Sequence, residues 1–125
     1  MESYKKPVTP SHIKEDIMSV NIFFSRDSEY DEFEAVCKGY RCDVYVSVDD
    51  KMYHLNIYTP QRLCQDFETE TAECGFYASE SNLVLAESAD RECIIKTILF
   101  QHSQKYFEEI KPLDSFDMKK LVRIR

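Results

Sequence analysis

One cysteine and one histidine have the residue types that nucleophilic catalysis needs. Cys64 lies near the start of a predicted helix, and His54 lies on the polar side of the preceding predicted strand. The N-terminus of a helix lowers the pKa of a nearby thiol, and an adjacent imidazole can accept the thiol proton. However, Cys64 stands beside Leu63 and Phe67 on the side expected to pack, and no third group or oxyanion donor can be named. We therefore predict no catalytic residues, and an enzymatic domain is kept as an alternative.

Other polar residues have structural interpretations. His102 lies within an apolar helix stripe, where a hydrogen-bonded structural histidine is expected, and Asp49-Asp50 are first of all turn residues. Glycines occur only at positions 39 and 75, so a Gly-rich phosphate loop cannot form. The five cysteines, at positions 37, 42, 64, 74 and 93, form no CxxC pair, and their odd number suits reduced thiols. No cofactor and no metal site is predicted.

Charge and length restrict the class of protein. The chain has 125 residues and 43% apolar residues, which fits one globular domain. Residues 15–117 contain 22 acidic and nine basic residues, a net charge of −13 against −7 for the whole chain. A segment with this net negative charge repels nucleic acid and anionic membranes and attracts a basic protein. With no apolar membrane span and no apolar signal core, we expect a cytoplasmic protein.

A period-2 pattern over residues 42–58 predicts a β-hairpin around which the rest is built. With an even-numbered turn, centred on Asp50-Lys51 or spanning Asp49 to Met52, all apolar side chains share one face. A three-residue loop would divide them, so we reject it. The expected pairs are Val48 with Tyr53, Val46 with Leu55, and Val44 with Ile57. The outer face then carries Asp43, Tyr45, His54, Asn56 and Tyr58. It is either a binding surface or a sheet face that another helix of the domain covers or that water simply wets.

The segments before the hairpin are less regular. Residues 1–15 have no periodicity and are expected to form an N-terminal arm, so the domain comprises residues 16–125. A strand is predicted from Asp16 to Phe24, with Phe23 exposed on its outer face. Residues 28–38 fit a helix or a short strand, and we favour the helix because a possible Ser28 cap, an acidic first turn and Lys38-Gly39 match helix ends.

A helix is predicted from Pro60 to about Ala72, with Thr59 as its cap and an end near Gly75. Carboxylates at the C-terminal end of a helix oppose its dipole, and here no basic residue compensates them. We expect charge reversal at this end to weaken partner binding without lowering thermal stability. The acidic residues are Asp66, Glu68, Glu70 and Glu73.

The C-terminal half is predicted to contain a strand over 82–86 and a long helix, capped by Ser88, that runs to about Glu109. Its sheet-facing stripe comprises Ile95, Ile98, Leu99, His102, Tyr106 and Ile110. A second stripe of Cys93, Phe100 and Phe107 needs cover from the C-terminal segment or from a partner, including a second copy of the chain. Residues 114–125 fit a short helix or an added strand.

These elements predict a single α+β domain, in which an antiparallel or mixed sheet of about four strands packs against two or three helices. The run DVYVSVDDKMYHLNIYTPQRLCQDFE, residues 43–68, resembles segments of small acidic cytosolic bacterial immunity-type proteins of polymorphic toxin systems. The resemblance implies a non-enzymatic protein that binds and neutralises a cognate, basic toxin. Our candidate binding residues, chosen from charge and tyrosine content, are Tyr45, His54, Tyr58, Asp66, Glu68, Glu70 and Glu73.

Two alternatives remain at this point. The chain could be a small-molecule-binding or enzymatic domain with a pocket between the sheet and the long helix, near His102 and Tyr106. It could also be a self-associating structural protein, a homodimer formed through Phe100 and Phe107.

Overall fold

The computed structural model describes residues 19–125; the predicted N-terminal arm and the start of the first predicted strand lie outside this range. It confirms a single α+β domain, with a mixed sheet of five strands and three α-helices. The elements are β1 (Val20–Phe24), α2 (Glu29–Lys38), β2 (Tyr40–Val48), β3 (Lys51–Tyr58), α3 (Pro60–Cys74), β4 (Leu83–Leu85), α4 (Arg91–Ser103), the 3₁₀ helices η1 (Tyr106–Glu108) and η2 (Met118–Lys120), and β5 (Val122–Arg123).

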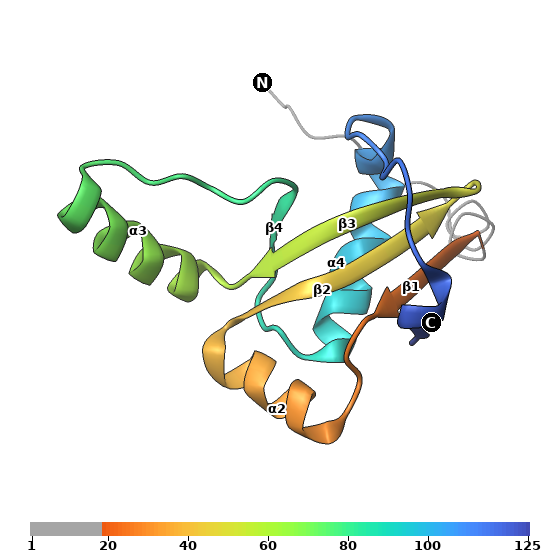
Figure 1. Cartoon of the computed structure of the whole chain (residues 1–125), viewed down its shortest axis with the longest axis horizontal. Helices are drawn as coiled ribbons and strands as arrows, with labels where there is room; N and C mark the ends of the chain where they lie inside the picture. The colour runs from red at the N-terminus through yellow and green to blue at the C-terminus, as the bar shows by residue number, and fades with distance from the viewer. Residues whose placement is uncertain (1–18) are drawn as a thin grey trace.

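The strand order is β4-β3-β2-β1-β5, and all neighbours are antiparallel except the pair β3 and β4. Helix α4 covers one face of the sheet, and the segment between η1 and β5 crosses the other face (Figure 1). We call residues 111–121 of this segment the C-terminal strap. It is attached where the Leu113 N–H donates to the Met52 carbonyl at 2.7 Å. The C-terminal residues thus form both a short helix and an added strand, and Phe23, predicted to be exposed, is buried on the crossed face.

The predicted faces of the hairpin are confirmed, but its pairing is wrong by two residues. Val46 pairs with Tyr53 and Val44 with Leu55, because the turn is the two-residue Asp49-Asp50. Both aspartates have positive φ, 50° and 67°, as the primed two-residue turns that match strand twist require. Every even-numbered turn keeps the same residues inward, so the apolar pattern could not distinguish these registers.

A β-bulge in β2 has a large effect on packing. The pairing shifts between Arg41, opposite Ile57, and Val44, opposite Leu55, so β2 has one residue more than β3 over this stretch. Ile57 and Leu55 both point into the core. Arg41 therefore turns to the inner side as well, and only 4% of its surface is exposed.

Helix α4 packs into the core through Ile94 and Ile98, which are fully buried. Ile95 and Leu99 are partly buried and pack against the core. The helix ends at Ser103, earlier than predicted, because Lys105 adopts a left-handed φ of 64° and η1 follows. This break turns Phe107 into the core and leaves Phe100 61% exposed. Cys93, Phe100 and Phe107 therefore do not form a second stripe. The strap crosses the face of the sheet opposite α4, so it does not provide the cover that was predicted (Figure 1).

Asp90 caps α4 in place of the predicted Ser88. Its carboxylate accepts the Cys93 N–H at 2.8 Å and the Ser88 hydroxyl at 2.8 Å. The hydrogen bond from the Cys93 backbone and then that from Ser88 hold the pKa of Asp90 below its usual value. Protonation of the Asp90 carboxylate is therefore less favourable in the folded chain than in the unfolded chain.

Replacing Asp90 by alanine should lower the free energy of unfolding by about 1 kcal/mol at neutral pH, the usual contribution of a helix cap. The contribution is complete above the pKa of the unfolded carboxyl, about 3.9, and is lost as pH falls through the lower folded pKa. Urea titrations of both chains at neutral pH and over a descending acid series would measure it. Asp114→Ala, at an exposed position, is the control. A difference that persists undiminished in acid would contradict the role of the ionised carboxylate.

Candidate protein-binding surfaces

The outer sheet face holds two of the predicted binding residues, Tyr45 and His54, under the C-terminal strap. Their rings lie 4.9 Å apart, and together with strap residues such as Phe116 they line a hollow of about 330 Å³. His54 Nε2 lies 2.6 Å from the Cys42 carbonyl oxygen, which can only accept, so Nε2 is the protonated nitrogen. The C-terminal strap, which is mostly irregular chain, covers this part of the face in place of the helix that the sequence interpretation had expected as cover.

Tyr58, the third predicted binding residue of the hairpin, is buried, with 6% of its surface exposed. It stacks on Tyr40 with ring centroids 5.4 Å apart, and burial is the main cause that raises the pKa of Tyr58 to about 12. Arg62 of α3 lies over the other ring of this pair, 4.4 Å from the centroid of Tyr40. Tyr58 thus belongs to the joint between the hairpin and α3.

Helix α3 projects from the end of the sheet as an arm (Figure 1). Its predicted ends are confirmed: Thr59 accepts the Arg62 N–H, Pro60 is the first residue, and Gly75 has a left-handed φ of 85°. None of its residues is buried. The predicted packing side is therefore wrong, and Cys64 is exposed. A helix-period apolar pattern shows which residues share a face, but not whether that face meets the core.

Aromatic side chains lie on this arm and on the chain that leaves it. Phe67 is 52% exposed and Phe76 is 64% exposed, and the rings of Phe67 and Tyr77 lie 6.0 Å apart. Large exposed aromatic side chains close together are typical of interaction sites. We call Phe67, Phe76 and Tyr77, with the acidic residues below, the α3 arm surface.

The four predicted carboxylates of α3 differ in their exposure and in how far a basic residue compensates their charge. Asp66 accepts a hydrogen bond from Arg62 Nε at 3.0 Å, so its charge is partly compensated. Glu68 and Glu73 are exposed, and Glu70 is half-buried. The pKa of Tyr77 is raised, first by burial and then by the negative charges of Asp66, Glu70 and Glu80. The arm therefore presents aromatic rings in a negative field.

Helix α2 has a second apolar surface, which the sequence pattern did not reveal. The preferred helix over 28–38 is confirmed, with a capping box at Ser28 and Gly39 at its end. Its buried side contains only Ala35, whereas Tyr30 and Phe33 are each 65% exposed and Val36 is 47% exposed. These three residues recur at helical spacing, which shows that they share a face but not that this face points to solvent.

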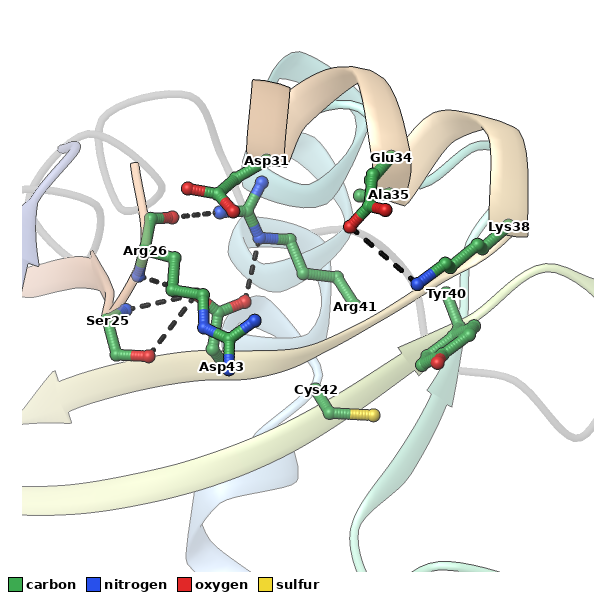
Figure 2. Close-up of a pocket in the computed structure, with 10 residues that line it drawn as sticks. All are labelled: Ser25, Arg26, Asp31, Glu34, Ala35, Lys38, Tyr40, Arg41, Cys42 and Asp43. Atoms are coloured by element: carbon green, nitrogen blue, oxygen red, sulfur yellow. Dashed lines mark hydrogen bonds and ion pairs between the residues drawn. The ribbon is translucent and has the colours of Figure 1, made fainter. Parts of the chain in front are cut away.

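Between α2 and β2 a hollow of about 430 Å³ contains many charged groups, and most of them bind one another (Figure 2). Arg41 donates to Asp43 at 2.8 Å, to Glu32 at 3.2 Å and to the Arg26 carbonyl, and it lies 3.6 Å from the Phe24 ring centroid. Asp43 also accepts the Arg26 N–H at 2.8 Å. Lys38 pairs with Glu34 at 3.6 Å. These contacts join α2 to the sheet, so we assign the cluster a structural role.

The catalytic and pocket hypotheses gain no geometric support. Among the described residues, four hollows of about 330, 410, 430 and 640 Å³ were compared: none is lined by both His54 and Cys64, and none is lined by His102 or Tyr106. Within residues 19–125, no three His, Cys, Asp or Glu side chains are placed to hold a metal ion. Across the same residues no helix combines the length and apolar content that crossing a bilayer requires. Comparison of the chain with protein-family models, curated protein sequences and solved structures gives no match.

Proposed function

We propose that this protein binds another protein with a basic surface through the α3 arm surface. The observation that carries the proposal is a 15-residue helix without a buried residue, with the exposed Phe67 in its middle and the exposed Phe76 just beyond its end. A helix that contributes nothing to the core needs another reason for its apolar residues, and burial against a partner supplies one. Of the two residues proposed for self-association, Phe107 is buried and only Phe100 is exposed, so the α3 arm surface is the better-supported site.

The negative charge of the α3 arm surface indicates that the partner's surface is positive. Glu68, Glu70 and Glu73 have no basic neighbour in the last turn of α3, and they form no ion pair among residues 19–125. Lys and Arg side chains of a partner would pair with them and complement the helix dipole. The resemblance of residues 43–68 to immunity-type proteins supports a toxin domain as this partner, neutralised in the bacterial cytoplasm.

Reversal of Glu68, Glu70 and Glu73 to lysine should weaken partner binding by about tenfold or more, since each exposed ion pair contributes about 0.2–1 kcal/mol and lysine adds repulsion. Thermal stability should be unchanged or slightly higher, because cations suit a helix C-terminus. Asp66 is retained in this variant because it pairs with Arg62. Titration calorimetry and thermal unfolding would measure the two quantities.

The matched control reverses three exposed carboxylates away from the arm, Glu108, Glu109 and Asp114. It changes net charge equally, so equal weakening in both variants would show that overall charge alone matters. Unchanged affinity in the arm variant would remove the α3 arm surface from the proposal.

The partner itself can be captured with a photo-crosslinking amino acid at position 67 or 76. We expect both positions to form an adduct with one and the same basic protein. The same group at Lys51, exposed beside the hairpin turn, should give no adduct. The neutralising role then requires that co-expression of this chain relieves growth inhibition by the captured protein. Adducts that form equally from position 51, or differ between 67 and 76, would contradict a specific site.

A further inference from the structure

Helix α2 borders two hollows on the side that faces residues 87–95. The hollow of about 410 Å³ is also lined by residues 59–65 at the start of α3, and the hollow of about 640 Å³ is also lined by the turn before α2. The first lies at the end of α2, between Val36 and Glu87, and the second lies at its start, between Glu29 and Glu92. Between them the Arg91 N–H donates to Glu32 at 2.7 Å and joins α2 to the facing segment. We call these two hollows and the exposed side of α2 the α2 groove.

Apolar side chains lie in both hollows and on the exposed side of α2. Val36 lines the first hollow and Ile95 lines the second, while Phe33 lies on α2 one turn before Val36 and is 65% exposed. An exposed helix face of this kind, rimmed by polar residues, marks a docking site for an apolar element. Residues on a docking helix at positions i, i+3 and i+7 would meet such a groove.

The charge of the residues around the α2 groove indicates what kind of partner can bind there. Helix α2 carries four carboxylates and one lysine, and the facing segment adds Glu87, Asp90 and Glu92 against Arg91. Two cations also line the first hollow, but Lys38 pairs with Glu34 and Arg62 pairs with Asp66. Asp90 is used as a helix cap, but Glu29, Glu87 and Glu92 form no ion pair with any of residues 19–125. A second copy of the chain would oppose two such acidic surfaces, which repel, and nucleic acid or an anionic membrane would be repelled likewise.

We infer that the α2 groove binds a basic amphipathic helix of a partner protein. Its apolar face would cover Phe33, Val36 and Ile95, and its Lys or Arg side chains would reach Glu29, Glu87 and Glu92 at the rim. The base of α3 lines the first hollow, but this site shares no residue with the α3 arm surface and does not depend on it. The two proposals can therefore fail separately.

The test uses the full chain and a fluorescent synthetic peptide of about 18 residues, five helical turns, with leucines on one face and lysines on the other. Fluorescence anisotropy would measure its Kd. Phe33→Ser should raise the Kd at least about tenfold, because the ring loses its apolar contact. Phe100→Ser, at a position of similar exposure on α4, should leave the Kd unchanged. Circular dichroism would show that both variants fold.

Two further measurements separate this site from the alternatives. Adding salt from about 0.05 to 0.5 M should raise the Kd, and Glu29→Lys with Glu92→Lys should reduce this dependence. Phe67→Ser on the arm should leave peptide binding intact. Absence of peptide binding, equal losses in Phe33→Ser and Phe100→Ser, or loss in Phe67→Ser alone would each overturn the inference. So would a wild-type dimer in sedimentation equilibrium that Phe33→Ser dissociates, because the groove would then bind a second copy.

Discussion

Replacement of Arg41 by alanine is expected to lower the free energy of unfolding by about 3–5 kcal/mol, the range for removing one partner of a buried ion pair. The guanidinium is almost fully buried and serves Asp43, Glu32 and the Arg26 carbonyl. Without it, the partly buried carboxylates of Asp43 and Glu32 lose their counter-charge, and the Phe24 ring loses a planar contact. Urea unfolding followed by circular dichroism would measure the change.

Two companion variants separate charge from packing at this position. Arg41→Met keeps much of the side-chain volume without the charge and should remain clearly destabilised, because the carboxylates are still unpaired. Lys38→Ala removes the exposed partner of Glu34 and should change stability by less than about 0.5 kcal/mol. If the losses in Arg41→Ala and Lys38→Ala were similar, the buried cluster would not hold α2 to the sheet.

Replacement of Gly39 by alanine should lower the free energy of unfolding by about 2–4 kcal/mol, a sum of left-handed strain and overpacking. Gly39 has a φ of 78°, and an added Cβ would lie 2.8 Å from Thr59 Oγ1 and 3.1 Å from Arg62 Cβ. The Gly39 carbonyl also accepts the Thr59 N–H at 2.9 Å. Since Thr59 caps α3, the substitution should displace the base of the arm as well.

Gly75 supplies the matched control, because its φ is 85° but nothing lies within 4 Å of an added Cβ. Gly75→Ala should therefore show the backbone strain alone, about 1–2 kcal/mol. Chemical denaturation of both variants would measure the difference. Equal losses would mean that the contact with Thr59 yields without penalty, and that α3 tolerates a shift at its base.

Local chemistry explains what the sequence could predict. Thr59-Pro60 and Ser28 begin helices, and the glycines at 39 and 75 end them, because capping depends on a few adjacent residues. The alternation of apolar and polar residues in the hairpin predicted its two faces, because this pattern also depends only on neighbouring residues. Its register depended on left-handed conformations of Asp49 and Asp50, which aspartate tolerates but does not require.

Features set by distant parts of the chain could not be predicted. Whether the apolar face of α2 or α3 meets the core depends on how much sheet remains uncovered, and α4 already fills one face and the strap the other (Figure 1). The burial of Arg41 depends on a bulge that no residue pattern marks. Both candidate surfaces therefore had to be found in the structure, although the carboxylates of the α3 arm surface were identified from charge alone.

The attachment of α3 through its first turn has an evolutionary consequence. Arg62 holds the base of the helix, through Lys38, Tyr40 and Asp66, while the outer turns contribute no buried residue. Mutations beyond Phe67 can therefore accumulate with little penalty to folding, whereas those at the base are restrained by the joint. If the arm binds a partner as we propose, such a division lets its specificity change while the sheet beneath it stays the same.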